Sequence, residues 1–206
     1  MALHVVDHPL ARHLLTTLRD VECEPQRFRI AARTLSTILI LEATRSMKLT
    51  ERKVRTPLEE MTDASLGQGL AVVPVLRAGL SMLEPALEIF PDVAVGYIGL
   101  ERNERTAVAH SYYCKLPVLK GKFTLCLDPM LATGGSASQA ITLLKESGAD
   151  KIVMVSVISA PDGVETLQND HPEVEVYTAA LDRELNIMKY IVPGLGDFGD
   201  RLYGTM

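Results

Sequence analysis

Short apolar runs of strand length alternate with stretches of helical spacing along most of this 206-residue chain, and this alternation restricts its fold more than any other feature. Runs rich in valine, isoleucine and leucine predict strands at 70–76, 93–98, 123–127, 151–158 and 174–181. Apolar residues three or four positions apart predict helices at 9–47, 80–90, 134–147 and 162–169. Strands that alternate with helices form a mainly parallel sheet covered on both faces, so we predict an α/β fold. The units are too few for an eight-stranded barrel, and the expected sheet is doubly wound, with an N-terminal helical segment.

Residues 101–120 depart from this alternation. The charged stretch Glu101–Arg105 and the polar, aromatic stretch His110–Tyr113 follow no single period. We therefore expect a mobile loop or β-hairpin that leaves the sheet over about 101–120. No linker, repeat or low-complexity tract divides the sequence, so residues 1–206 are expected to form a single domain.

Charge and cysteine content narrow the classes of function. The 21 lysines and arginines against 26 aspartates and glutamates give a formal net charge of -5, which argues against a nucleic-acid-binding protein. Cys23, Cys114 and Cys126 form no C-x-x-C pair, so we expect free thiols in a reducing compartment. The first residues lack a signal-peptide pattern and no apolar run is long enough to span a bilayer, which predicts a cytoplasmic location. The five histidines do not cluster, and we expect all of them on the surface.

The segment 125–136 carries the strongest local signal for chemistry. A predicted strand ends at the acidic residue Asp128, and a turn of small residues leads into a helix that starts at about Ser136. Backbone N–H groups and hydroxyls over 133–136 would form an anion site at the helix N-terminus. A carboxylate repels phosphate but accepts hydrogen bonds from a sugar diol, so one interpretation is a cradle for ribose 5-phosphate. The other is a tight strand-to-helix turn with Ser136 as N-cap, and this segment alone leaves both open.

Four segments in the same order resemble the uracil phosphoribosyltransferase family: Val73–Leu80, Tyr112–Pro117, Asp128–Ser136 and Tyr190–Arg201. The resemblance covers nearly the whole chain and implies the type I phosphoribosyltransferase fold. It also implies a reaction of pyrimidine salvage, in which uracil and 5-phosphoribosyl 1-diphosphate (PRPP) give UMP and diphosphate. Mg²⁺ would arrive bound to PRPP oxygens, with no direct ligand from the protein, because this ion prefers phosphates and water.

The resemblance also implies the site residues. Arg102, Asp128 and Asp197 are the expected catalytic residues, with Arg105 as the alternative to Arg102 for the loop arginine. The expected PRPP-binding residues are Arg77, Arg102, Asp128, Pro129, Met130, Leu131, Ala132, Thr133, Gly134, Gly135, Ser136 and Asp197. A C-terminal uracil hood over about 182–206 would bind the base through Ile191, Gly196, Asp197 and Phe198. Main-chain groups complement the acceptor–donor–acceptor edge of uracil and would reject cytosine.

Some features depart from the family pattern or leave alternatives open. The stretch Asn103–His110 differs from the usual loop sequence, and Phe198 stands where many members carry alanine. Asp128-Pro129 replaces the two adjacent acidic residues of other phosphoribosyltransferases, which favours the uracil branch over purine bases. The family suggests a homodimer or homotetramer with GTP as an activator. The alternatives are an RNA-binding regulator with the same fold and an enzyme that uses another base.

Overall fold

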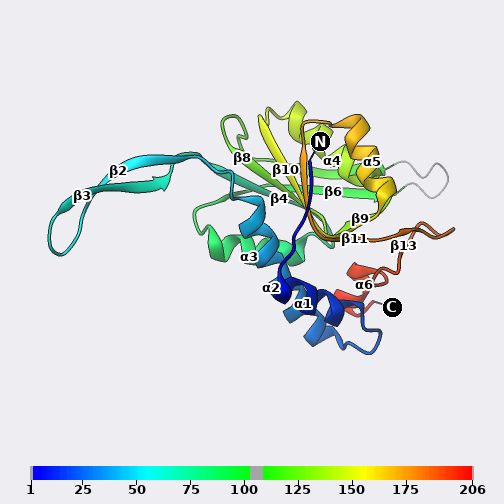
Figure 1. Cartoon of the computed structure of the whole chain (residues 1–206). Helices are drawn as coiled ribbons and strands as arrows, with labels where there is room; N and C mark the ends of the chain where they lie inside the picture. The colour runs from blue at the N-terminus through cyan, green and yellow to red at the C-terminus, as the bar shows by residue number, and fades with distance from the viewer. Residues whose placement is uncertain (1, 103–108, 206) are drawn as a thin grey trace.

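The computed structural model describes residues 2–102 and 109–205, and a nine-stranded sheet forms the centre of this part of the molecule (Figure 1). The strands lie in the order β1-β11-β10-β8-β4-β6-β7, with β5 paired to β4 and β9 paired to β10. Neighbouring strands are parallel except β6 and β7. The bounds are β1 Leu3–Val5, β4 Leu70–Leu76, β5 Ala94–Val95, β6 Tyr97–Arg102, β7 Ala109–Lys115, β8 Phe123–Leu127, β9 Met130–Leu131, β10 Lys151–Ser159 and β11 Glu175–Leu181.

Helices cover both faces of this sheet. Their bounds are α1 Pro9–Arg19, α2 Pro25–Ala43, α3 Leu80–Ile89, α4 Gly135–Glu146, α5 Pro161–Asp170 and α6 Phe198–Tyr203. Buried residues of α1, α2, α3 and α6 share one hydrophobic cluster, and those of α4 and α5 share the other. The prediction of a doubly wound α/β fold with a mainly parallel sheet is confirmed.

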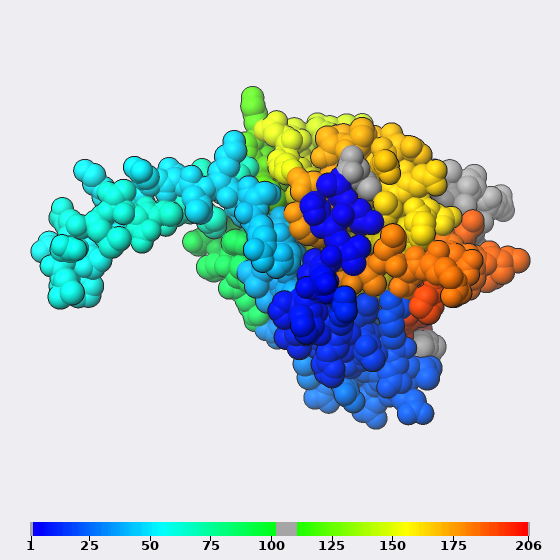
Figure 2. All heavy atoms as spheres, in the orientation of Figure 1, coloured from blue at the N-terminus to red at the C-terminus, as the bar shows by residue number. Residues whose placement is uncertain are grey.

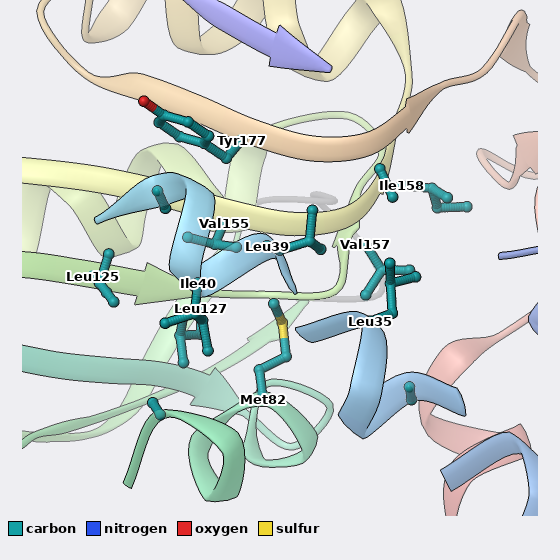
Figure 3. Close-up of a cluster of buried hydrophobic side chains, with 14 of the residues drawn as sticks. Leu35, Leu39, Ile40, Met82, Leu125, Leu127, Val155, Val157, Ile158 and Tyr177 are labelled. Carbon is teal, nitrogen blue, oxygen red and sulfur yellow. The ribbon is translucent and has the colours of Figure 1, made fainter. Parts of the chain in front are cut away.

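The central strands are apolar at nearly every position because both of their faces are buried. In β4, Val72 belongs to the first cluster, whereas Ala71 and Val73 belong to the second. Figure 3 shows side chains of α2 and α3 packed on the strands that form the first cluster. The labelled residues are Leu35, Leu39, Ile40, Met82, Leu125, Leu127, Val155, Val157, Ile158 and Tyr177.

Sequence periodicity missed several elements. The predicted helical stretch 9–47 is two helices, because residues 20–24 form a turn and Pro25 starts α2 at a position where its missing N–H costs nothing. The expected strand at 93–98 is divided into β5 and β6. The edge strand β1 and the antiparallel hairpin of β2 (Leu49–Arg55) and β3 (Glu60–Leu66) were not predicted. This hairpin extends away from the body of the molecule (Figures 1 and 2).

The expectation that every histidine lies on the surface is wrong for His171. This residue is only 6% exposed, because α4 and α5 pack together around it. Its Nδ1 lies 2.7 Å from the Lys145 Nζ, and its Nε2 lies 2.9 Å from the carbonyl oxygen of Ser138. The side chain therefore joins the end of α5 to α4.

The predicted excursion over 101–120 begins as a β-hairpin. Strand β7 pairs antiparallel with β6 at the edge of the nine-stranded sheet, so the described part of this stretch extends the sheet and does not leave it as expected. Residues 103–108, which include most of the unusual stretch Asn103–His110, lie outside the described residues. In the described parts of the chain, no helix has the length and apolar character that a bilayer-spanning segment requires.

Candidate active site

A cavity of about 680 Å³ opens at the carboxyl ends of β4, β6 and β8, where an open α/β sheet usually binds ligands. Residues from four parts of the chain line it. They are Leu76, Arg77 and Ala78; Leu100, Glu101 and Tyr112; Asp128, Met130, Ala132 and Ser136; and Met188, Lys189, Tyr190, Ile191, Gly196, Asp197, Phe198 and Gly199. The topology thus joins all four motif segments around one space.

The phosphate loop, residues 128–136, connects β8 to α4. Gly134 is the N-cap of α4 and has φ of 83°, a left-handed conformation that glycine adopts without steric cost. Helix α4 starts at Gly135, between the two starts that the sequence suggested, at 134 and at about Ser136. Of the predicted PRPP-binding residues in this loop, Asp128, Met130, Ala132 and Ser136 line the cavity, and Pro129 and Leu131 are buried behind them.

Asp128 has an electrostatic environment unlike that of a surface carboxylate. Its half-buried side chain lines the cavity and accepts a hydrogen bond from the backbone N–H of Met130 at 3.2 Å. Burial raises the pKa of Asp128 to about 6, and the bond from Met130 opposes that shift only in part. Within the part of the chain that the structure describes, this carboxylate has no ion-pair partner, which leaves it able to accept hydrogen bonds from hydroxyl groups.

The two predicted arginines come from neighbouring strands. Arg77 directly follows β4, just as Asp128 directly follows the neighbouring strand β8, and the exposed side chain of Arg77 lines the same cavity. Its backbone carbonyl accepts a hydrogen bond from the hydroxyl of Tyr203 at 3.3 Å, which connects this turn to α6. Arg102 is the last residue of β6 and is paired with Ala109, and its side chain lies outside the described part of the chain.

The hood forms a second wall of the cavity. Strands β12 (Glu184–Leu185) and β13 (Ile191–Val192) form a short antiparallel hairpin, and α6 follows. Ile191, Gly196, Asp197 and Phe198 all line the cavity, as predicted. The Asp197 side chain also caps α6, because its Oδ1 accepts a hydrogen bond from the N–H of Asp200 at 2.9 Å.

A buried ion pair that sequence reasoning missed anchors this hood. Asp182 accepts two hydrogen bonds from Arg19 at the end of α1, at 2.8 and 2.5 Å. The same carboxylate accepts from the N–H of Gly194, and Arg19 donates to the carbonyl of Gly194 at 2.7 Å. Arg201 of α6 adds bonds to the carbonyls of Leu18 and Leu195. Helix α1 therefore fixes the position of the hood backbone.

The side chain of Phe198 packs into the protein core. It is 1% exposed, and its ring meets Phe28 of α2 edge to face with 5.1 Å between centroids. The large ring that replaces the alanine of many family members therefore fills the core beneath the hood. The contribution of Phe198 to the cavity wall therefore comes mainly from its backbone.

Several lining residues were not predicted as site residues. Glu101 and Tyr112 come from the β6–β7 hairpin, and Met188, Lys189 and Tyr190 come from the turn between β12 and β13. Tyr112 and Tyr190 lie within two of the four segments that resemble the family, so those segments could have identified them as site residues. Glu101, Asp128 and Asp197 bring three carboxylates to the cavity that also receives Arg77. Their oxygens suit hydrogen bonds from water on a phosphate-bound Mg²⁺.

Comparisons with known proteins identify one family over nearly the whole chain. The sequence model of the family described as "Uracil phosphoribosyltransferase" matches residues 5–205. Proteins with this name from Levilactobacillus brevis and Finegoldia magna are 47% and 48% identical, and each match covers 98% of this chain and 97% of the relative. The solved structure of the AQ2163 protein from Aquifex aeolicus has a TM-score of 0.93 and 40% identity, with 98% and 97% of the chains covered. The fold of adenine phosphoribosyltransferase from Thermoanaerobacter pseudethanolicus is similar, with a TM-score of 0.52, 14% identity, and 78% and 84% covered.

Proposed function

Because the chain belongs to the uracil phosphoribosyltransferase family, as its four motifs predicted, we propose that it transfers the 5-phosphoribosyl group of PRPP to N1 of uracil. The products are UMP and diphosphate, and the reaction belongs to pyrimidine salvage. One observation carries this proposal: the acidic residue Asp128, Ser136 in the first turn of α4 and the hood residues line the same cavity.

The two walls divide the recognition of the substrates. On the phosphate-loop wall, backbone N–H groups over 132–136 would bind the 5-phosphate, and Asp128 would accept hydrogen bonds from the ribose hydroxyls. On the hood wall, backbone groups of Ile191, Gly196 and Phe198 would pair with the edge of uracil. The bound base and sugar would then face each other across the cavity, so that N1 lies opposite the leaving diphosphate.

The chemistry requires positioning and charge stabilisation more than a covalent nucleophile. The bond from C1 to the diphosphate oxygen breaks as the bond from N1 to C1 forms, and the ribose passes through an oxocarbenium-like state. The N1–H bond of uracil breaks as well, and its proton leaves to the diphosphate or to water. Arg77 and Arg102 would stabilise the charge that develops on the diphosphate. Asp197 would lie near the ribose, where its carboxylate opposes the positive charge. Mg²⁺ bound to PRPP supplies further neutralisation of the leaving group.

The oligomeric state, the activator and the cellular location are also proposals. We propose a homodimer or homotetramer, which the projecting β2–β3 hairpin supports because it carries exposed apolar residues such as Leu58 and Met61. GTP is proposed as an activator, to be tested by its addition to the assay. A cytoplasmic location suits the three unpaired cysteines, of which Cys114 is exposed.

The test is incorporation of radiolabelled uracil into UMP with PRPP and Mg²⁺, in parallel with cytosine, hypoxanthine and orotate. Turnover with uracil alone is the expected result. Turnover with a different base would retain the phosphate-loop assignment and overturn that of the hood. PRPP binding without turnover of any base would favour the RNA-binding regulator, and salt-sensitive RNA affinity would then be measured.

A further inference from the structure

Helix α5 lies directly behind the phosphate loop and contacts three consecutive carbonyl groups of its backbone. The carbonyl of Leu131 accepts a hydrogen bond from the N–H of Ala160 at 2.8 Å, and that of Thr133 accepts from the Thr166 hydroxyl at 2.8 Å. The carbonyl oxygen of Ala132, between them, faces Gly163, since a Cβ built on Gly163 would lie 2.6 Å from it. These carbonyls therefore all point toward α5 or the residue before it.

The orientation of a carbonyl sets the orientation of the next N–H. In a trans peptide unit these two groups point in opposite directions. The carbonyls of residues 131, 132 and 133 point toward α5, so the N–H groups of Ala132, Thr133 and Gly134 point away from it. Ala132 and Ser136 line the cavity and no residue of α5 does, so we infer that these N–H groups point to the cavity side of the loop. Three successive N–H groups directed to one side form a concave anion site.

Close packing leaves α5 and the loop little freedom to separate or slide. A Cβ on Gly134 would lie 2.7 Å from the Cβ of Thr166, and a Cβ on Gly163 would lie 2.8 Å from the Leu131 carbonyl oxygen. Glycine at these two positions allows the loop backbone to rest against the helix. The Thr166 hydroxyl is the side-chain group that then selects the orientation of the 133–134 peptide.

We propose that Thr166 is a positioning residue for the 5-phosphate of PRPP, and that Gly163 provides the space that this role requires. Thr166 touches no substrate in this arrangement. Its hydroxyl holds the Thr133 carbonyl, and the Gly134 N–H is thereby preorganised for the phosphate before the substrate arrives. The assignment rests on the proposed function for the identity of the ligand, and it adds a residue that the family motifs in this chain do not contain.

The test compares Thr166→Val, which removes the hydroxyl at nearly constant volume, with Thr166→Ser, which keeps it. Thr37→Val is the matched control. Thr166 also donates to the carbonyl of Asp162 four residues earlier, and Thr37 donates in the same way to Arg33 on α2, far along the chain from the loop. Both valine variants lose this local bond, but only Thr166→Val loses the bond to the loop.

The measurements are KM for PRPP, KM for uracil and kcat in the uracil assay, with thermal melting of each variant. For Thr166→Val we expect KM for PRPP to rise about tenfold, with KM for uracil and kcat changed less than about threefold. Thr166→Ser should restore KM for PRPP, and Thr37→Val should leave it unchanged. An unchanged KM for PRPP in Thr166→Val, or an equal rise in Thr37→Val, would overturn the proposal.

Calorimetric titration with PRPP and Mg²⁺ in the absence of uracil separates this proposal from the proposed function. If the unaltered protein binds PRPP but does not use uracil, the proposed reaction is wrong, and weaker PRPP binding by Thr166→Val alone still supports the positioning role. Equal PRPP affinity in all four proteins would refute the role of Thr166, whatever base the enzyme uses.

Discussion

The two walls of the cavity are built in different ways. The phosphate-loop wall is a continuous stretch of chain between β8 and α4, and the helix that supports it, α5, belongs to the next βα unit. The hood wall is held by Arg19 and Asp182, which are 163 residues apart in sequence. One wall therefore depends on local turn chemistry and the packing of neighbouring elements, whereas the other depends on a long-range ion pair. Substitutions in the two walls should consequently change stability and the two KM values in different ways.

The largest effect is expected for Asp182→Ala, which tests whether the hood depends on its distant anchor. Removal of a 5% exposed carboxylate would leave the Arg19 guanidinium and the Gly194 N–H without their acceptor. We expect unfolding in urea to show a loss of about 2–4 kcal/mol and KM for uracil to rise more than KM for PRPP.

Asp7→Ala is the control for Asp182→Ala, because Asp7 pairs with Arg12 at 2.8 Å on the surface. Such an exposed pair contributes little to stability, so a change within about 0.5 kcal/mol is expected. Equal rises in the two KM values in Asp182→Ala would show that the walls are not independent. The comparison between them would then fail.

This difference between the walls also explains what the sequence could predict. Asp128, Gly134 and Ser136 lie within one short segment, so a strand, a turn and a helix start can be read from adjacent residues. Asp182 and Arg19 look like ordinary surface charges in the sequence. Their pairing exists only after the chain has folded, and no local pattern marks it. The predicted roles of the site residues remain predictions, although the positions of most of them around one cavity agree with the motifs.

Phe198 and the β2–β3 hairpin show two further limits of sequence reasoning. Whether the Phe198 ring faces the base or the core depends on its contact with Phe28, which comes from another part of the chain. The β2–β3 strands are exposed at nearly every position, so they lack the alternation of buried and exposed residues that reveals most antiparallel strands. Strands of the central sheet were predictable because burial on both faces requires continuous apolar runs.

The next largest effect is expected for Phe198→Leu, which tests whether this hood residue acts through the core. The smaller side chain would leave a gap beside Phe28, and we expect thermal or urea unfolding to show a loss of about 1–2 kcal/mol. KM for uracil should change less than about threefold, because the ring does not face the base. Phe28→Leu, which alters the other ring of the same contact, should behave alike in both measurements. A selective loss of uracil affinity in Phe198→Leu would place its ring in base recognition.

A change in stability of similar size but opposite sign is expected for Asp128→Asn on the phosphate-loop wall. The folded-state pKa of about 6 lies above the ordinary value of 3.8, so the folded state holds its proton more tightly. The ionised carboxylate thus destabilises the fold above about pH 6, and this cost fades as the pH falls toward 4. We expect Asp128→Asn to be more stable than the unaltered protein by about 1–2 kcal/mol at pH 7.5, with the difference absent near pH 4.

Activity should change in the opposite direction. The amide accepts hydrogen bonds from ribose hydroxyls less strongly than a carboxylate, so KM for PRPP should rise in Asp128→Asn. In the unaltered protein, KM for PRPP should rise as the pH falls through about 6. Asp92→Asn, at an exposed aspartate, is the control for stability. A stability gain that persists unchanged at pH 4 would show that burial of the Asp128 charge is not its cause.

The smallest change in stability is expected for substitutions of Lys189. This residue of the hood wall has a left-handed backbone conformation, which in the phosphate-loop wall is adopted by Gly134. Lys189 has φ of 65° and is the one non-glycine residue with positive φ in the described part of the chain. A left-handed conformation costs a residue with a Cβ about 1 kcal/mol. Hydrogen bonds from the N–H groups of Met188 and Tyr190 to the Asn186 side chain hold this turn independently of the lysine side chain. We therefore expect Lys189→Gly to stabilise the protein by about 0.5–1 kcal/mol in urea unfolding.

Lys189→Ala separates backbone strain from the loss of charge, because alanine removes the ammonium group but keeps the Cβ. If backbone strain is the cause, Lys189→Gly gains stability and Lys189→Ala does not. Both variants lose the positive charge at the cavity, so any change in KM for PRPP that arises from this loss should be the same in both. Equal stability of the two variants would mean that the turn holds Lys189 without strain. The long-range anchor would then be the difference between the hood and the phosphate loop, because the hood turn would carry no backbone strain.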